Sequence, residues 1–196
     1  MLAGAAARAR PRHTAGMAAI LPPRLRDGEL LLRPMEERDV PAMVAACQDP
    51  EISRWTRVPV PYTAEDARRF MAIAAASAAA GDGVALIVAG PGDVLAGTIG
   101  LMEVDRGRGR GEIGYWLAAG ARGKGVATRA VVLLRDWAHA ELGLDELEVM
   151  PHRDNAASNA VAVRAGFVDT GEVVRVQRMP PGRRDGYRRY VWRGLR

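Results

Sequence analysis

The chain has 196 residues, 48% of them hydrophobic and 26% charged, which is enough for one soluble domain with its own core. No apolar run reaches the roughly 18 residues that a membrane-spanning helix needs. The single cysteine, Cys47, excludes an internal disulfide and a cysteine-based zinc site. The three histidines are scattered, so no metal site is expected.

The formal charge of +5 comes from the start of the chain. Five arginines precede Asp27, the first acidic residue: Arg8, Arg10, Arg12, Arg24 and Arg26. The remainder has 23 basic and 23 acidic residues, so its charge does not indicate a nucleic-acid partner.

Residues 1–27 are rich in Ala, Arg and Pro and contain no continuous apolar segment, which argues against a secretory signal. We expect a disordered extension at 1–27, followed by a domain at 28–196. An Arg-rich, acid-poor start also resembles a mitochondrial transit peptide, and a true start at Met17 is a further alternative. A cytoplasmic location is the expectation.

Strand and helix patterns alternate along the domain. In chain order they predict a strand at 29–34, helices at 40–47 and 63–80, strands at 84–89, 94–104 and 112–117, a helix at 126–142, a strand at 147–150, a helix at 156–165, and strands at 167–176 and 187–195. Asp49-Pro50 is interpreted as a helix stop, and 55–62, with its two prolines, as an extended loop. The Arg-Gly repeat at 106–111 predicts a hairpin loop rather than an RNA contact.

A glycine-rich turn, Arg122-Gly123-Lys124-Gly125, separates the strand at 112–117 from the long helix. The first backbone N–H groups of a helix have no partner within it and lie at the positive end of the helix dipole, so such a turn can bind an anion. The turn lacks the spacing of a Walker A loop, and Thr128 replaces the third small residue of a Rossmann fingerprint. An ordinary strand–turn–helix connection remains an alternative.

Arg122, Gly125 and Ala127 match the acetyl-CoA loop of the GNAT N-acetyltransferases, Gln/Arg-x-x-Gly-x-Gly/Ala. Three further motifs resemble the branch of that family that contains the ribosomal-protein N-terminal acetyltransferases: Leu30 to Pro34, Glu112 to Trp116, and Asn155 and Ser158 followed by Ala165 to Phe167. The resemblance implies an α/β (α+β) GNAT fold. In that fold a mixed, mostly antiparallel, twisted sheet of six to seven strands is flanked by about four helices and splayed between the fourth and fifth strands.

The resemblance also implies residue roles. The residues expected to bind the pyrophosphate of acetyl-CoA are Arg122, Gly123, Lys124, Gly125, Val126, Ala127 and Thr128. A backbone N–H near Trp116 and Leu117 is expected to stabilise the oxyanion, and Asn155 to contact the pantetheine. Ser158 is expected to contact the cosubstrate and to protonate the leaving thiolate, although it also fits as a small packing residue.

The general base is the least defined role. Glu103 and Glu112 lie at strand ends from which either could reach the splayed gap, although acids at strand ends are commonly solvated. An α-amine, whose reference pKa is about 8, needs less help from a base than a lysine amine does. Cys47 has no predicted His partner, so a covalent acyl-enzyme is not expected.

The sequence therefore predicts an acetyl-CoA-dependent N-acetyltransferase acting on a peptide N-terminus or a small amine, as a monomer or homodimer. The segment 49–62, with Trp55, is a candidate lining of the acceptor site. Two other hypotheses stay open. One is a non-catalytic CoA-binding regulatory module, and the other is an RNA-associated protein that uses Arg106, Arg108 and Arg110.

Overall fold

A computed structural model describes residues 18–177, 179 and 182–194. These residues form one eight-stranded sheet with the strand order β1-β2-β3-β4-β5-β6-β8-β7. The strands are β1 Leu25–Asp27, β2 Leu30–Arg33, β3 Val84–Ala89, β4 Leu95–Asp105, β5 Arg110–Leu117, β6 Glu146–Val149, β7 Val168–Val174 and β8 Tyr187–Arg193. All neighbours pair antiparallel except β5 and β6, which are parallel.

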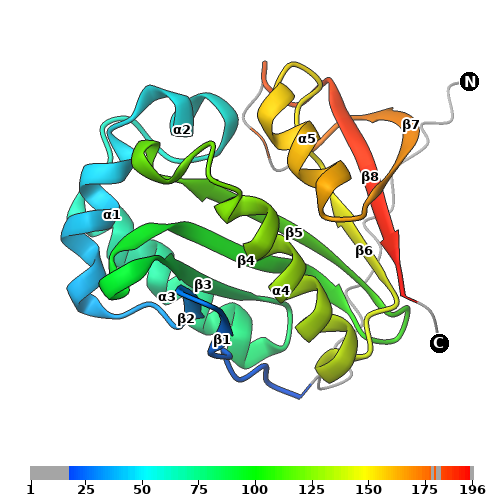
Figure 1. The fold of residues 1–196 in the computed structure, drawn as a ribbon, viewed down its shortest axis with the longest axis horizontal. Helices are drawn as coiled ribbons and strands as arrows, with labels where there is room; N and C mark the ends of the chain where they lie inside the picture. Colours follow the sequence, from blue (N-terminus) through cyan, green and yellow to red (C-terminus); the bar gives the residue numbers. More distant parts are fainter. Residues whose placement is uncertain (1–17, 178, 180–181, 195–196) are drawn as a thin grey trace, which may run out of the picture.

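Helices cover both faces of the sheet (Figure 1). The α-helices are α1 Val40–Cys47, α2 Pro50–Trp55, α3 Ala64–Ala80, α4 Val126–Leu142 and α5 Ala156–Arg164. Short 3-10 turns lie at Glu37–Asp39, Pro91–Asp93 and Ala119–Ala121. None of the helices in the described ranges is long and apolar enough to cross a membrane.

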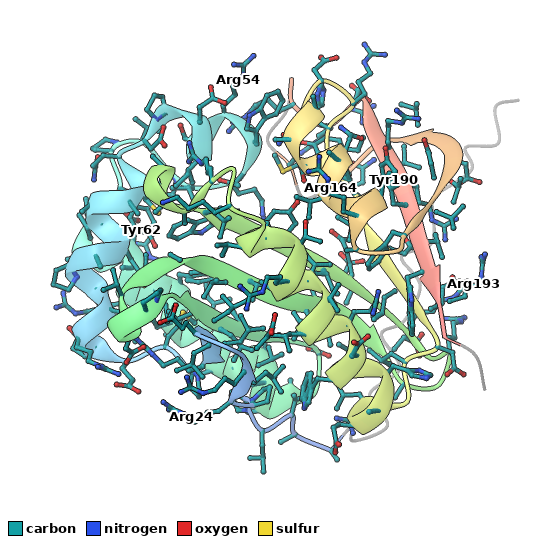
Figure 2. The ribbon with its side chains drawn as sticks, in the orientation of Figure 1. Arg24, Arg54, Tyr62, Arg164, Tyr190 and Arg193 are labelled. Atoms are coloured by element: carbon teal, nitrogen blue, oxygen red, sulfur yellow. The ribbon has the colours of Figure 1, made fainter. Side chains whose placement is uncertain are left out.

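Two hydrophobic clusters hold these layers together. On one face, Val131 and Leu134 of α4 are fully buried against the sheet. On the other face, Met43 of α1 and Ala67 of α3 are buried against Ile87 of β3. Each fully buried Val, Leu, Ile or Met stabilises the fold by about 1.5–3 kcal/mol. The spacing of these apolar residues along each helix therefore determines which face of the helix packs against the sheet. In contrast, the labelled arginines of Figure 2 project from the surface: Arg24, Arg54, Arg164 and Arg193.

The predicted fold class is confirmed, with two additional elements. The described residues contain eight strands and five helices because β1 and α2 are present. β1 has three residues, too few to show a strand period, and is held by pairing with β2. Its position means that the packed chain begins before residue 28. Pro50 begins α2 instead of ending a helix, because proline fits the first helical position and the Asp49 side chain accepts a bond from the Glu51 N–H.

The predicted splay lies between β5 and β6. These strands pair only over the register Arg110↔Glu146 to Glu112↔Glu148. Beyond Glu112, β5 continues to Leu117 while β6 ends at Val149, and the two strands diverge (Figure 1). The last five residues of β5 therefore have β4 on one side and no strand on the other in the described part of the chain.

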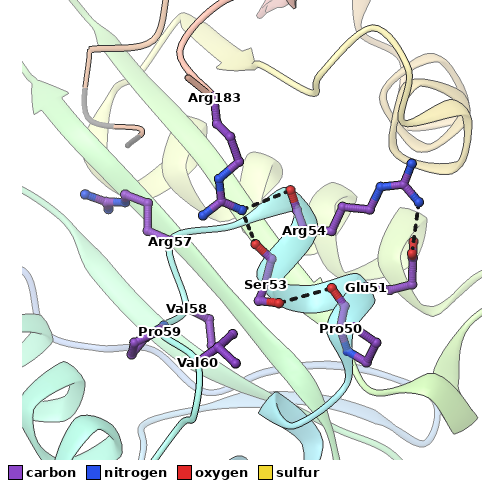
Figure 3. A pocket seen from close by; sticks show the side chains of 9 residues that line it. All are labelled: Pro50, Glu51, Ser53, Arg54, Arg57, Val58, Pro59, Val60 and Arg183. Carbon is purple, nitrogen blue, oxygen red and sulfur yellow. Dashed lines mark hydrogen bonds and ion pairs between the residues drawn. The ribbon is translucent and has the colours of Figure 1, made fainter. Parts of the chain in front are cut away.

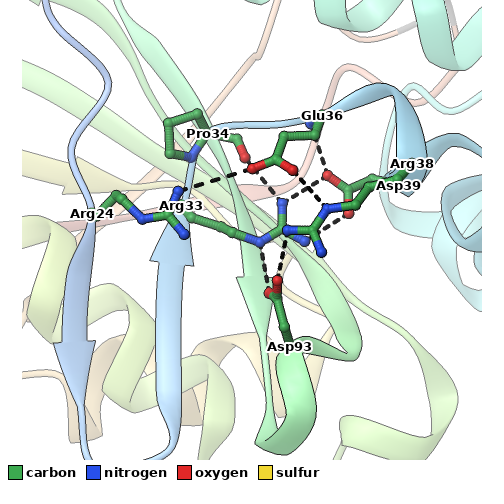
Figure 4. A network of polar contacts seen from close by, with 7 residues as sticks. All are labelled: Arg24, Arg33, Pro34, Glu36, Arg38, Asp39 and Asp93. Atoms are coloured by element: carbon green, nitrogen blue, oxygen red, sulfur yellow. Dashed lines mark hydrogen bonds and ion pairs between the residues drawn. The ribbon is translucent and has the colours of Figure 1, made fainter.

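A buried arginine anchors the first strands on the side of the sheet away from this gap. Arg33 is 1% exposed, and its guanidinium bonds Asp39 through both Nη atoms at 2.7 and 2.8 Å and Asp93 through Nε at 2.7 Å (Figure 4). Arg38 contacts the other oxygen of Asp93 at 2.7 Å. Burial opposes ionisation of Asp39, but hydrogen bonds from Arg33 and the Glu36 N–H keep its pKa below the usual value. The network fixes β2 to the turn that enters α1 and to the hairpin between β3 and β4.

Candidate active site

A cleft of about 210 Å³ lies where β5 leaves β6. Its walls come from four places: α2, the end of β5, the glycine-rich turn before α4, and α5. The lining residues from the turn and the strand are Tyr115, Trp116, Leu117, Arg122, Gly123 and Ala127. Those from the helices include Glu51, Ile52, Trp55, Asn155 and Ser158. The fold thus brings together most of the site residues that the sequence predicted, although they are spread over about 40 positions of the chain.

The turn before α4 presents its backbone to this cleft. Gly123 and Gly125 have φ values of 73° and 74°, a left-handed conformation that residues with a Cβ rarely adopt. A Cβ at either position would meet no heavy atom within 4 Å, so the space over the turn is open. Among the described residues, no backbone carbonyl accepts from the N–H groups of Gly123, Lys124 or Gly125. These amides, together with the first turn of α4, can bind an anion.

The two cationic side chains of the turn contact protein carbonyls. Arg122 donates to the Leu117 carbonyl through Nε at 3.0 Å and Nη2 at 2.8 Å, and its Nη2 lies 2.8 Å from the Asp49 carboxylate. The Lys124 Nζ bonds the Gly120 carbonyl at 2.7 Å. Arg122 therefore connects the end of β5 to Asp49, the N-cap residue of α2. The cofactor-binding roles predicted for Val126 and Thr128 depend on their backbone N–H groups in the first turn of α4. The contacts of Arg122 and Lys124 do not involve these N–H groups.

A pair of hydroxyl groups faces the cleft between β5 and α5. The Asn155 side chain caps α5 by accepting a bond from the Ser158 N–H at 3.1 Å. The Ser158 Oγ then lies 2.8 Å from the Tyr115 Oη, and either hydroxyl can donate. Burial raises the pKa of Tyr115 to about 12, although the bond to Ser158 acts in the opposite direction. Tyr115 is therefore a neutral hydroxyl at physiological pH and can donate a hydrogen bond.

Tyr115 is the site residue that sequence reasoning did not single out. Tyr115 belongs to the motif Glu112 to Trp116, from which only the family resemblance was inferred. The alternation of side chains along the strand could have identified Tyr115 as a site residue. Side chains two residues apart share a face, so Tyr115 lies with Ile113 and Leu117 on the face covered by α4. A hydroxyl in that apolar row needs a polar partner, and Ser158 is the one that the fold supplies.

The structure does not bring the two predicted bases to the cleft. Glu112 is 6% exposed and lies where β5 still pairs with β6, and alternation puts it on the face opposite Tyr115. Glu103 is exposed on β4 and has a φ of 52°, at the irregularity in the β4–β5 pairing. Glu51 of α2 is the one carboxylate in the cleft lining, as far as the described ranges extend. It lies in the segment 49–62 that was expected to line the acceptor site, but it was not named as a site residue because α2 was not predicted.

The Arg-Gly hairpin between β4 and β5 is engaged in local ion pairs. Arg108 contacts Asp105 at 3.1 Å, and Arg110 contacts Glu146 at 3.0 Å. Two of the three arginines considered for RNA binding thus have carboxylate partners within the fold. This arrangement gives the RNA hypothesis no support beyond the composition of the loop.

A family comparison matches residues 29–168 to the acetyltransferase (GNAT) domain. The chain belongs to this acetyltransferase family. The match confirms the predicted enzyme class, an acyltransferase, and acetyl-CoA as its cosubstrate. The glycine-rich turn and the open edge of β5 therefore both belong to an acetyltransferase domain. The roles of individual site residues stay predictions.

Two curated relatives from the genus Bacillus match this GNAT chain. A B. subtilis (strain 168) protein named as a ribosomal N-acetyltransferase, YdaF, is 37% identical over 78 residues, which are 40% of this chain and 43% of that protein. The chain thus matches less than half the length of that relative. The N-acetyltransferase p20 of B. licheniformis is 32% identical over 132 residues, 66% of this chain and 73% of p20.

A solved structure shows the same fold. Mycobacterium smegmatis RimJ, in complex with CoA-disulfide, superposes with a TM-score of 0.79 at 19% identity, over 91% of this chain and 90% of RimJ. This likeness and the name of the B. subtilis relative confirm the predicted resemblance to the ribosomal-protein acetyltransferase branch.

Proposed function

We propose that the protein is an acetyl-CoA-dependent N-acetyltransferase that transfers the acetyl group to a primary amine by direct attack in a ternary complex. The observation that carries this proposal is the Tyr115–Ser158 hydroxyl pair, which lines the same cleft as Gly123 of the glycine-rich turn and the unpaired end of β5. An anion site, an extended edge and a proton donor are the three features that thioester aminolysis requires of the protein.

The proposed reaction uses each of these features. The turn amides bind the diphosphate of acetyl-CoA, and the open edge of β5 near Trp116 and Leu117 aligns the pantetheine. The amine nitrogen then attacks the thioester carbonyl carbon, and a backbone N–H near the end of β5 stabilises the oxyanion. When the C–S bond breaks, the thiolate takes a proton from the Ser158 hydroxyl, which regains one from Tyr115. The nitrogen loses its extra proton to water, and Tyr115 regains a proton from water, which leaves an amide, CoA thiol and two neutral hydroxyl groups.

A covalent intermediate on cysteine does not fit this site. Cys47 lies on α1, is 2% exposed and is absent from the cleft lining. Burial raises the pKa of its thiol to about 12, so the nucleophilic thiolate is not formed at neutral pH. This supports direct transfer from acetyl-CoA to the acceptor.

The proposal is tested by incubating the protein with acetyl-CoA and a panel of amines: peptides with free N-termini, polyamines, aminoglycosides and amino acids. Thiol release and the acetylated product, identified by mass spectrometry, are both measured. We expect acceptor-dependent thiol release with a mass gain of one acetyl group on the acceptor. Tight acetyl-CoA binding with no turnover on any amine would contradict the proposal and favour a CoA-binding regulatory module.

A further inference from the structure

A second, outer cleft of about 570 Å³ lies on the other side of α2 (Figure 3). α2 separates it from the cleft that contains Ser158, because Ile52 and Trp55 face inward and Ser53 and Arg54 face outward. The loop after α2 forms one wall through Val58. The opposite wall carries Arg183, from the connection between β7 and β8.

The outer cleft is rich in positive charge. Arg54, Arg57 and Arg183 line it, and Glu51 is the single acid among the described residues of its lining. Arg183 bonds the carbonyls of Ser53 and Arg54, which orients its guanidinium without neutralising it. Arg54 stacks over the Trp55 ring at 4.6 Å and contacts Glu51 at 3.2 Å.

Arg57 differs from these two arginines. Its side chain is exposed, and within the part of the chain that the structure describes no carboxylate or carbonyl contacts it. An arginine without an internal partner in the described part of the chain, in a cleft that two other guanidinium groups also line, is complementary to an anionic ligand group. Three guanidinium groups around one opening would repel a polycation such as a polyamine.

Glu51 connects the two clefts, because it is the one residue that lines both. The Trp55 Nε1 donates to its carboxylate at 3.1 Å. Hydrogen bonds from Trp55 and then from Arg54 lower the pKa of Glu51, so the carboxylate is ionised at neutral pH. An ionised carboxylate at the junction is complementary to an ammonium group that passes from the outer cleft to the inner one.

We propose that the outer cleft selects acceptors in which an acidic group follows the primary amine, and that Arg57 contacts this group. The acceptor class is a peptide N-terminus with acidic residues at its second and third positions. Its ammonium group lies at Glu51 and its carboxylates lie among Arg57, Arg183 and Arg54. The inference rests on the proposed function, because it specifies the acceptor of that transferase.

The test compares two fluorescent peptides of equal length, with the N-terminal sequences Ser-Asp-Glu and Ser-Lys-Lys, by anisotropy without acetyl-CoA. The wild-type protein should bind the acidic peptide about tenfold more tightly, and the difference should shrink as salt rises. Arg57→Gln should weaken binding of the acidic peptide about two- to fivefold, which is the effect of losing one exposed charge pair. Arg26→Gln is the matched control, because Arg26 is also exposed and has no ion pair with any described residue, but lies on β1 at the far edge of the sheet.

Equal binding of the two peptides, or equal effects of Arg57→Gln and Arg26→Gln, would overturn the inference. Acetyl transfer to the same peptides separates this result from failure of the proposed function. Selective binding of the acidic peptide without acetyl transfer would contradict the proposed transferase function but would still support the preference for acidic acceptors. Transfer to both peptides at the same kcat/KM would contradict the selection and leave the transferase standing.

Discussion

At the scale of single residues, the proposed chemistry depends on the hydroxyl pair of Tyr115 and Ser158. The role of Ser158 was predicted from the family resemblance of the Asn-x-x-Ser pattern, and helix geometry added only that Ser158 shares a side of the helix with Asn155. Tyr115 was not predicted, because its partner is 43 residues away and only the folded sheet brings them to 2.8 Å. A single sequence does not show which side chains from different strands and helices come into contact.

Replacing either hydroxyl should slow the chemical step without affecting cosubstrate binding. We expect Ser158→Ala to lower kcat about a hundredfold, the loss typical of a missing proton donor, with an unchanged KM for acetyl-CoA. Tyr115→Phe should lower kcat less, about tenfold, because water can replace the phenol as partner of Ser158. Steady-state kinetics measure both variants.

The double variant tests whether the two groups act together. If the proton passes through both, Ser158→Ala with Tyr115→Phe should be no slower than Ser158→Ala alone. Fully multiplicative losses would show that the hydroxyl groups act independently and would contradict the relay. A rise in the KM for acetyl-CoA that accounts for the whole loss would assign both residues to binding.

At the scale of elements, the glycine-rich turn and α2 form two adjoining walls of the site. The turn and α4 were predicted at residue level, because glycine spacing and helical periodicity are local signals. α2 was not, because Asp-Pro is compatible with both a helix end and a helix start. The segment 49–62 was expected to line the acceptor site, but without the helix the individual positions of Glu51 and Arg54 and the outer cleft could not be predicted.

Arg122 joins these two walls, so its removal should affect both. Arg122→Ala loses the bonds to the Leu117 carbonyl and to Asp49, and we expect the Kd for acetyl-CoA to rise about tenfold. Stability should fall by less than about 1 kcal/mol, because the ion pair is exposed. Calorimetric titration and chemical denaturation measure the two effects.

Lys124→Ala is the control for this variant. It removes a positive charge from the same turn, but Lys124 contacts only the Gly120 carbonyl in the described structure. A smaller change in the Kd is expected. Equal effects of the two substitutions would show that charge in the turn, rather than the connection to α2 and β5, determines affinity.

At the scale of the whole molecule, the sequence predicted the sheet, its splay and the helix layers. It did not predict the short edge strand β1, which exists only through pairing with β2. It also gave no sign that Arg33, in the Leu30 to Pro34 motif, is buried. That burial depends on Asp93, 60 residues away in the chain.

The Arg33 network should contribute strongly to stability. Arg33→Met leaves Asp39 buried without its cationic partner, and we expect a loss of about 3–5 kcal/mol in the free energy of unfolding. Arg38→Met is the matched control, because Arg38 contacts the same Asp93 from an exposed position and should cost less than about 1 kcal/mol. Urea denaturation measures both. Similar losses would contradict the role assigned to burial.

The same network predicts how stability depends on acid. Hydrogen bonds from Arg33 hold the pKa of Asp93 below its usual value, and the folded pKa of Asp39 is also lowered. Their stabilisation is therefore present above the unfolded value of about 3.9 and is lost as pH falls through the folded values. Unfolding free energy measured from pH 6 to pH 2 should fall in the wild type more steeply than in Arg33→Met. Parallel curves would contradict this assignment.

The central claim is that acetyl-CoA lies with its diphosphate on the turn amides and its thioester at the hydroxyl pair. A crystal structure of the protein with acetyl-CoA tests it most directly. The account predicts diphosphate oxygens within hydrogen-bond distance of the N–H groups from Gly123 to Ala127, and the thioester sulfur beside the Ser158 Oγ. A diphosphate bound elsewhere, or a thioester directed away from Ser158 and Tyr115, would contradict it.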